Sequence, residues 1–402
     1  MTETTDVAIV GGGPAGTALA IHLARAGIQA TVFERRERPE WHACGVFSSP
    51  LTRRRLASLG FSIAEIARLN RPISALNLET TQGAACRIEY ANGHACGFDR
   101  VALDTALLDA ASAAGAAVRT ATVVRSVGLP VDRTGMAMLT VSSTHAEADA
   151  AEPVRARLVV GADGSSSVVA RAARVYATSP FLRRSGVTFH RFDPVAEEAD
   201  RPMEGRFVFG NDWYVGIAPV PGDRVNVGMV LPAKYLRAAE PSAVTERILA
   251  QFPGAPAPWM SAPTTDHIAI AGRLEHHVRR AAGRGFLLVG DAIEFIDPLT
   301  GEGLNRAFVS AELAAESIAR TLRGDPNAMA DYDRRIRARW RSKNVVSWVL
   351  QAFLSQPRAF DYALRRLTRR DRLREQLTLV LTDQSPASGV IDPRYLLRLL
   401  AP

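Results

Sequence analysis

The sequence has little cysteine and no long apolar run. Its 402 residues include three cysteines, Cys44, Cys86 and Cys96. Thiols this sparse are typical of the reducing cytoplasm and offer no ligand set for a metal cluster, so we expect no bound metal. No stretch approaches the roughly 18 uninterrupted apolar residues of a membrane span. The first strand pattern begins within six residues of the start, which leaves no room for a signal peptide, and we therefore expect a cytoplasmic protein.

Lysine is also scarce, since only Lys234 and Lys343 occur among 49 basic residues. The formal net charge of +8 comes from the C-terminal part, because residues 331–402 hold 15 basic and 7 acidic residues and the remainder is balanced. Arginine stems commonly cover apolar surface, so a helical segment packed on the rest of the chain is one interpretation. Contact with an anionic membrane surface, a coenzyme A thioester or an acyl carrier protein is the other. No recognisable nucleic-acid-binding module accompanies the arginines, and we expect no nucleic acid partner.

What the sequence does contain is a glycine-rich turn near its start. A short apolar run leads into residues 11–16, GGGPAG, and a second apolar run ends on Glu34, 23 residues after Gly11. Gly11 allows the backbone to turn tightly, Gly13 leaves room for a pyrophosphate, and Gly16 lets the following helix pack closely on its strand. The positive end of that helix favours phosphate, and an acid placed like Glu34 accepts hydrogen bonds from a ribose. The spacing predicts a βαβ dinucleotide-binding unit.

Two further glycine-acid motifs lie far downstream. One apolar run ends on Asp163-Gly164, and another ends on Gly290-Asp291. After the second, Asp297-Pro298 leads into Gly301-Glu302-Gly303, just before an alanine-rich helix pattern over 304–322. Free backbone amides at such a helix start point at an anionic or polar group. Asp291, at the end of a strand, is suited to accept a hydrogen bond from a ribitol hydroxyl. A simple nicotinamide dehydrogenase needs neither motif.

Together these motifs carry a family resemblance. Gly11-x-Gly13-x-x-Gly16 with Glu34, Asp163-Gly164, and Gly290-Asp291 with Asp297-Pro298 look like the three fingerprints of the glutathione-reductase-type FAD enzymes, which include the class A flavoprotein monooxygenases and the geranylgeranyl reductase family. The resemblance implies an α/β fold in which a Rossmann-like FAD-binding domain carries an inserted mixed β-sheet domain for the substrate. A helical C-terminal segment follows. The helix pattern that starts at Arg100 resembles the arginine-led helix that borders the flavin in this family.

The resemblance implies bound FAD, with NAD(P)H as the reductant, and a set of cofactor contacts. The implied contacts fall on Gly11, Gly13, Pro14, Ala15, Gly16, Glu34, Arg35, Cys44, Arg100, Val124, Asp163, Gly290, Asp291, Pro298, Gly301, Gly303, Leu304 and Asn305. No second nucleotide fingerprint is visible for the nicotinamide, as is usual in the monooxygenase class.

The order of motifs and strand patterns predicts a discontinuous domain arrangement. The FAD-binding domain takes residues 1–75, 99–178 and 268–325, the substrate-binding β-sheet domain takes 76–98 and 179–267, and the basic helical segment takes 326–402. Ligands favour domain junctions, so we expect a small-molecule substrate between the inserted sheet and the flavin.

The resemblance leaves the reaction open. Asn305, directly after Gly303-Leu304, is what aromatic hydroxylases usually show. It favours a monooxygenase that acts on a small cyclic, aromatic or polyketide-like substrate, free or bound to a carrier or coenzyme A, through a flavin hydroperoxide. Cys44-Gly45 and the segment 297–304 look instead like the geranylgeranyl reductases, which reduce isoprenoid double bonds, although residues 213–219, WYVGIAP, replace that group's aromatic motif. We place oxygenation first and alkene reduction second. A flavin oxidase, or a FAD-binding protein without catalysis, is a further alternative.

Three side chains are candidates for a part in the reaction. Tyr214 could donate a hydrogen bond to a substrate oxygen, although a strand tyrosine beside Trp213 is more often core. Glu294 stands just after Asp291, where hydroxylases often place a histidine, and would face the flavin or solvate a turn. Cys44 would lie beside the cofactor as a small buried residue.

Overall fold

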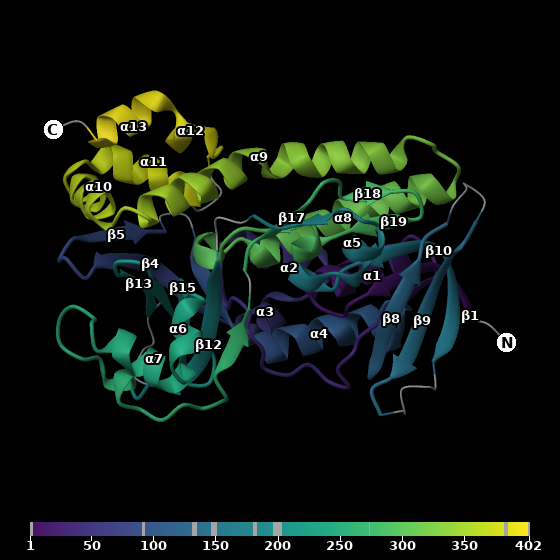
Figure 1. Cartoon of the computed structure of the whole chain (residues 1–402), viewed down its shortest axis with the longest axis horizontal. Helices are drawn as coiled ribbons and strands as arrows, with labels where there is room; N and C mark the ends of the chain where they lie inside the picture. The colour runs from purple at the N-terminus through teal and green to yellow at the C-terminus, as the bar shows by residue number, and fades with distance from the viewer. Residues whose placement is uncertain are drawn as a thin grey trace.

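A computed structural model describes residues 3–90, 93–130, 135–145, 151–179, 183–195, 203–272, 274–381 and 385–400. Two large sheets organise these ranges, one at the N-terminal end of the molecule and one beside the C-terminal helices (Figure 1). The long helix α9 (Ala328–Leu354) runs between the two ends. The predicted α/β fold, with an inserted mixed sheet and a helical C-terminal segment, is confirmed. Across the described ranges, none of the helices combines the length and the apolar character needed to cross a bilayer.

The first sheet has eight strands around a parallel centre. In order they are β18 (Ala282–Gly283), β19 (Phe286–Leu288), β10 (Glu152–Gly161), β1 (Glu3–Val10), β2 (Ala30–Phe33) and β7 (Ala117–Arg119), with β9 (Ala137–Ser143) pairing with β10 and β8 (Thr122–Gly128) pairing with β9. Strands β19, β10, β1, β2 and β7 pair in parallel. The middle strands are buried apolar runs, as expected for strands covered on both faces. The carboxyl ends of these strands therefore meet at one edge.

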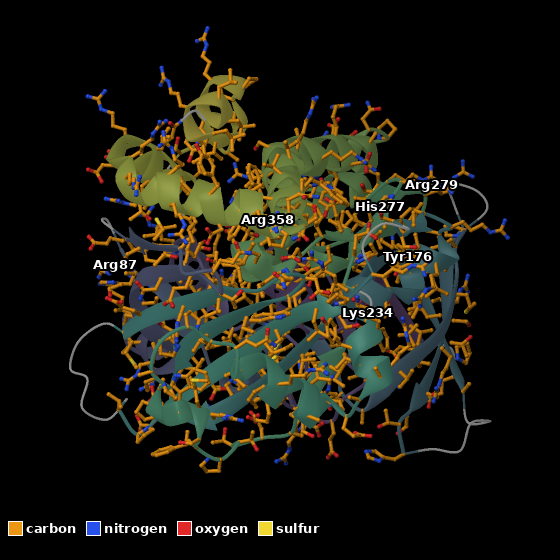
Figure 2. The ribbon with its side chains drawn as sticks, turned by 60° about the vertical axis from the view of Figure 1, so that its left-hand side comes forward. Arg87, Tyr176, Lys234, His277, Arg279 and Arg358 are labelled. Carbon is orange, nitrogen blue, oxygen red and sulfur yellow. The ribbon has the colours of Figure 1, made fainter. Side chains whose placement is uncertain are left out.

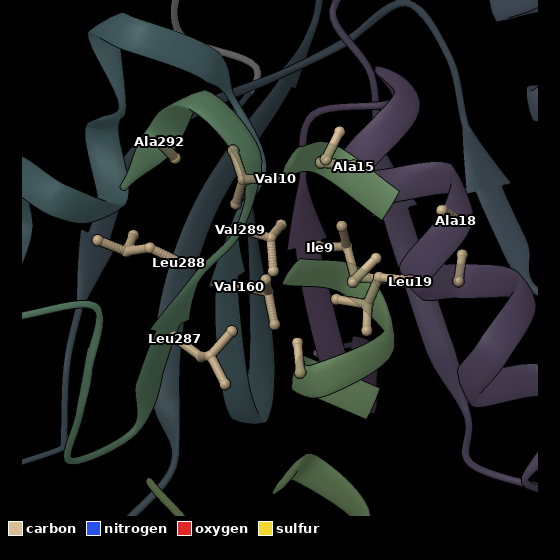
Figure 3. Close-up of a cluster of buried hydrophobic side chains, with 14 of the residues drawn as sticks. Ile9, Val10, Ala15, Ala18, Leu19, Val160, Leu287, Leu288, Val289 and Ala292 are labelled. Carbon is tan, nitrogen blue, oxygen red and sulfur yellow. The ribbon is translucent and has the colours of Figure 1, made fainter. Parts of the chain in front are cut away.

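The core beneath that edge is packed by strand and helix side chains. Figure 3 shows Ile9 of β1 and Val160 of β10 beside Leu19 of α1 (Pro14–Arg25). Helix α1 in turn packs against α4 (Arg100–Ala113) and α8 (Gly303–Leu322). All of the labelled side chains in Figure 3 are buried, so the glycine turn that joins β1 to α1 stands on a rigid base.

The second sheet has nine strands and is mostly antiparallel. In order they are β16 (Ala269–Ala271), β12 (Arg184–Phe192), β15 (Arg224–Pro232), β14 (Tyr214–Val220), β13 (Met203–Phe209), β4 (Asn70–Thr80), β6 (Ala95–Phe98) and β3 (Phe47–Ser48), with β5 (Ala85–Glu89) beside β4. Side chains alternate between its faces: Val225 and Val227 pack on α7 (Pro241–Leu249), whereas Asn226 and Gly228 line the side that faces the first sheet.

Shorter elements complete the molecule. The remaining helices are α2 (Leu51–Ser58), α3 (Ile63–Leu69), α5 (Val168–Ala172), α6 (Lys234–Ala238), α10 (Pro357–Arg369), α11 (Asp371–Leu381), α12 (Ser388–Ile391) and α13 (Pro393–Leu400). A small third sheet joins β11 (Tyr176–Ala177), β17 (His276–Val278) and β20 (Glu294–Phe295). Strand β3 and the start of β4 belong to the second sheet although they lie within the range 1–75 assigned from sequence to the first domain. The exact domain ranges stay a prediction.

The basic C-terminal segment divides into two parts. On α9, Arg335 forms an ion pair with Glu316 of α8 at 2.8 Å, whereas Arg334 and Arg337 pair with acids of α9 itself. On α10 and α13 several arginines make no ion pair with any residue in the described ranges, namely Arg358, Arg366, Arg369, Arg394 and Arg398. Of these, Arg358, Arg369, Arg394 and Arg398 are exposed to solvent, and Arg358 is labelled in Figure 2. The partner expected for this segment stays a prediction.

Candidate functional site

A cavity of about 690 Å³ lies between the two sheets. One wall is the edge where the parallel strands of the first sheet end, together with the starts of α1 and α8. The opposite wall is the inward face of β12, β15 and β14. Ligands of open α/β sheets bind at the carboxyl ends of the strands, and this volume falls in the range of cofactor and ligand sites. The cavity is therefore the candidate functional site.

The glycine turn at the first wall is built for a close approach. Gly11 has φ +106°, and a Cβ there would lie 2.4 Å from the Ala162 carbonyl oxygen. A Cβ on Gly16 would lie 2.0 Å from the carbonyl oxygen of Gly11, so the helix meets its strand without room for a side chain. A Cβ on Gly13 would meet nothing within 4 Å, so this backbone is open to the cavity at the N-terminus of α1.

Three carboxylates, those of Glu34, Asp163 and Asp291, line this wall and differ in the hydrogen bonds that they already accept. Glu34 accepts from the backbone N–H groups of Gly12 at 2.8 Å and Arg36 at 2.9 Å. Asp163 accepts from the Val168 N–H at 2.6 Å, while its Oδ1 atom is buried with no partner in the described part of the chain. The carboxylates of Glu34 and Asp163 thus lie beside the cavity and can accept further hydrogen bonds.

Asp291 is the third of these carboxylates. Burial raises its pKa to about 6, and the positive charges of Arg306 and Arg100 only partly oppose this. It lies at the end of β19, on a 3₁₀ turn formed by Gly290–Ala292. A cavity-facing acid that is costly to ionise gains most from a ligand that donates hydrogen bonds to it.

Arg100 begins α4 and fixes the loop on the other side of the cavity. Its Nη1 donates to the Gly45 carbonyl at 2.9 Å, and its guanidinium pairs with Asp104 at 3.3 Å. Cys44, next to this contact, lines the cavity, and burial raises the pKa of its thiol to about 11. The thiol therefore stays protonated near neutral pH, which suits packing rather than nucleophilic chemistry.

The long helix α9 supplies polar side chains that motif reasoning missed. Lys343 Nζ lies 2.7 Å from Glu302 at the start of α8. Asn344 donates to Glu294 at 2.5 Å and accepts from Arg306 at 2.8 Å. A signal was present in the sequence, since Lys343 is one of only two lysines, but nothing in the pattern of α9 located its partners. Glu294 is thus held by α9 beside the cavity.

Most of the residues predicted from sequence come together at the cavity. Those that line it are Gly11, Gly13, Pro14, Ala15, Glu34, Arg35, Cys44, Arg100, Val124, Asp163, Tyr214, Asp291, Glu294, Pro298, Gly301, Gly303 and Leu304. Gly16, Gly290 and Asn305 do not line it. Gly290 donates its N–H to Ser310, and the Asn305 side chain donates to Glu302 at 3.2 Å. Both residues thus bind to neighbours behind the cavity wall.

The opposite wall is mainly apolar but carries two polar groups. Tyr214 donates its hydroxyl hydrogen to Asp297 at 2.5 Å, so this proton is not available to a substrate, and its ring belongs to the buried core, as the alternative interpretation expected. Burial, reinforced by the charge of Asp297, raises the pKa of Tyr214 well above its ordinary value, and the phenol stays protonated. Asn226 and Thr188 form the second polar group. Between the two groups, Gly216 and Gly228 are paired across β14 and β15, with the Phe207 ring over Gly216 and open space over Gly228.

The residues at the first wall fit FAD. The open cradle at Gly13 recurs at Gly303, where a Cβ would again meet nothing within 4 Å. Each glycine stands at the start of a helix, α1 and α8, whose free N–H groups favour phosphate or a polar ring edge. Glu34 and Asp291 provide acceptors for the hydroxyl groups of ribose and ribitol.

Comparison with known proteins agrees with this assignment. The family model described as FAD binding domain matches residues 4–347. The chain belongs to this FAD-binding family. It is accordingly a FAD-dependent oxidoreductase.

Relatives of the FAD-binding protein differ in their reactions. Digeranylgeranylglycerophospholipid reductase 1 of Methanopyrus kandleri is 28% identical over 346 residues, which are 83% of this chain and 85% of that one. The crystal structure of a flavoprotein/dehydrogenase from Cytophaga hutchinsonii has a TM-score of 0.81 at 18% identity and covers 98% of this chain and 95% of its own. The p-nitrophenol 4-monooxygenase PnpA of Pseudomonas putida has a TM-score of 0.77 at 17% identity, with 95% and 99% covered. The two structural likenesses show the fold.

Proposed function

We propose that the protein is a FAD-dependent monooxygenase that uses NAD(P)H and molecular oxygen to act on a small ring-shaped substrate. The observation that carries this proposal is the inward face of β12, β14 and β15, which we call the substrate wall. There the polar groups at Tyr214–Asp297 and Asn226–Thr188 flank a flat surface made by the Phe207 ring and Gly228. A flat ring with a polar substituent matches such a wall, because Asn226 Oδ1 accepts no hydrogen bond from the described residues and would gain one from a polar ligand. A plain hydrocarbon chain would leave that oxygen unpaired.

Bound FAD would accept a hydride from NAD(P)H and, once reduced, would activate oxygen. The chain's own contribution is to bind, orient and exclude water. Phe207 and Val230 line the substrate side of the cavity with apolar surface, and Phe207 folds over Gly216, where a Cβ would lie 2.8 Å from its ring. Tyr214, locked on Asp297, keeps its ring in one position. Apolar side chains on this side of the cavity would help to keep water away from a reactive centre.

Alkene reduction is the second candidate function. It is favoured by the 28% identity to the reductase of Methanopyrus kandleri, whose name describes action on a digeranylgeranylglycerophospholipid. The apolar part of the wall would accept an isoprenoid chain. We place this function second because the polar groups of the wall have no role in it.

The two functions are separated by their use of oxygen. FAD-loaded protein is mixed with NADPH or NADH and either 2-naphthol or geranylgeraniol, in air and without oxygen. For a monooxygenase we expect 2-naphthol to stimulate oxygen consumption and NAD(P)H oxidation together, with label from ¹⁸O₂ in the product. Reduction of geranylgeraniol without oxygen, and no label in any naphthol product, would establish the reductase and contradict our proposal.

A further inference from the structure

The substrate wall contains one amide whose hydrogen-bonding capacity is half used. Asn226 on β15 is 5% exposed, lines the cavity and lies directly opposite His190 of β12 in the sheet register. Its amide nitrogen lies 3.0 Å from Thr188 Oγ1, 3.2 Å from the Phe189 carbonyl oxygen and 3.3 Å from His190 Nε2. Among the described residues, none donates to its oxygen, Oδ1.

The neighbours fix which end of the amide faces the cavity. The Phe189 carbonyl can only accept a hydrogen bond, so the nitrogen of Asn226, and not its oxygen, must face it. The same orientation leaves Thr188 Oγ1 as an acceptor. A flipped amide would put Oδ1 against the carbonyl oxygen and lose these bonds. Oδ1 is therefore held as an acceptor on the cavity side.

A buried histidine and aspartate support this orientation from behind. Asp266 lies 2.5 Å from His190 Nδ1, and its other oxygen accepts the His190 backbone N–H at 2.9 Å. A carboxylate at Nδ1 places the ring proton there, so Nε2 carries no hydrogen against the amide nitrogen. The two amide hydrogens serve Thr188 and Phe189, and Nε2, at 3.3 Å, can only share one of them. Burial raises the pKa of Asp266, but the hydrogen bonds from His190 outweigh this and hold it below its ordinary value. The Trp41 ring packs on the imidazole, with centroids 4.2 Å apart.

The acceptor stands over an open part of the floor. A Cβ on Gly228 would have Asn226 Oδ1 at 3.7 Å and Thr188 Oγ1 at 3.9 Å as near neighbours. Because Thr188 accepts from the amide, its own hydroxyl hydrogen remains available to a ligand. The space above Gly228 is thus bordered by one fixed acceptor and one hydroxyl donor. A ligand group that both donates and accepts, such as a hydroxyl, satisfies the two together.

We propose that Asn226 and Thr188 form a subsite above Gly228 that binds a hydroxyl group of the ring substrate, with Asn226 Oδ1 accepting its hydrogen and Thr188 donating to its oxygen. This subsite rests on the proposed function and names its substrate class: a flat ring that bears a free hydroxyl. His190 and Asp266 are positioning residues, because they act through the amide and do not touch the ligand.

Equilibrium binding tests the subsite without turnover. FAD-loaded protein is titrated calorimetrically with 2-naphthol, 2-methoxynaphthalene and naphthalene, which differ in whether they donate, only accept, or do neither. We expect 2-naphthol to bind at least about tenfold more tightly than the other two. Asn226→Leu and Thr188→Val should each remove most of this preference, and Thr188→Ser should restore it. Thr245→Val, a buried substitution on α7 outside the cavity, is the matched control and should change nothing.

The positioning role has its own readout. Asp266→Asn can donate to Nδ1, which would move the His190 proton to Nε2, against the amide nitrogen. We expect a changed ¹⁵N signal of His190 and a selective loss of 2-naphthol affinity, with naphthalene binding unchanged. Equal binding of the three ligands to the wild type, or a preference that survives Asn226→Leu, would overturn the subsite. Should the Asn226 variant fail to fold, the Thr188 pair decides alone. A reductase could still show the preference, so failure of the subsite and failure of the monooxygenase proposal are distinct results.

Discussion

Replacing Asp291 by asparagine should make the FAD-free protein more stable and the FAD complex weaker. The pKa of this carboxyl is raised from 3.8 to about 6 by burial. The folded FAD-free protein therefore binds the proton more tightly than the unfolded chain, and ionisation above pH 6 opposes folding. At 1.36 kcal/mol per pKa unit, the cost is about 3 kcal/mol at pH 8. This is an upper bound, because the carboxylate retains some exposure to the cavity.

The pH dependence gives the prediction its sign. The penalty is nearly full above pH 6, falls to roughly half of that at pH 5, and disappears below the unfolded value of 3.8. Urea unfolding of FAD-free protein, followed by tryptophan fluorescence, should show Asp291→Asn to be more stable than the wild type at pH 8, with a gap about half as large at pH 5. Asp109→Asn, exposed on α4, is the control and should stay within about 0.5 kcal/mol at both pH values.

FAD affinity should change in the opposite direction. A hydrogen bond to a charged acceptor contributes about 1.5–3 kcal/mol, so Asp291→Asn should weaken FAD binding on the order of 10- to 100-fold, as measured by titration of FAD fluorescence. An FAD-free variant that is less stable than the wild type at pH 8, or a stability gap that does not change with pH, would refute the reasoning. So would unchanged FAD affinity, because the carboxylate would then have no role at the cofactor.

Three further predictions address the turn, the core and the surface. Gly13→Ala should leave the stability of the FAD-free protein within about 0.5 kcal/mol, since its Cβ meets nothing within 4 Å, yet it should lower FAD affinity at least about tenfold. Gly16→Ala places a Cβ 2.0 Å from a carbonyl oxygen and should cost at least about 2 kcal/mol of stability in urea unfolding. Tyr332→Phe removes a buried 2.6 Å bond to a strand carbonyl and should cost about 1–3 kcal/mol in the same assay, and no change would contradict the packing described. If the basic segment meets an anionic membrane, the double variant Arg358→Glu with Arg398→Glu should reduce sedimentation with phosphatidylglycerol vesicles at least about tenfold, and equal sedimentation would remove that partner.

The FAD end of the site could be predicted because its parts are close in sequence. Residues 11–16 form a strand end, a turn and a helix start within one βαβ unit, so their spacing alone implies their geometry. Asp163 and Asp291 follow the same logic, since each ends an apolar strand and parallel strands end at one edge. Asn305 shows the limit of this reasoning, because its side chain turns to Glu302 behind the wall.

The substrate end could not be predicted in the same way. Asn226, Thr188 and His190 carry no motif, and a polar residue in a strand pattern reads equally well as surface. Their meeting depends on the register of β12 against β15, which places His190 opposite Asn226. Likewise α9 reads as a basic amphipathic helix, and only its packing on α8 shows that Lys343 serves the cavity.

The sequence by itself determined a dinucleotide-binding βαβ unit, because phosphate binding at a helix start requires glycines at short, fixed intervals along the chain. FAD and the fold class followed from the family resemblance that the three motifs carry together. The tertiary structure decided which side chains face the substrate. The contacts that orient Asn226 join residues 36 to 38 positions apart, and the one behind it, between His190 and Asp266, spans 76. Contacts of that kind arise from strand pairing and domain packing, whose energies are spread over many residues and leave no local pattern to read.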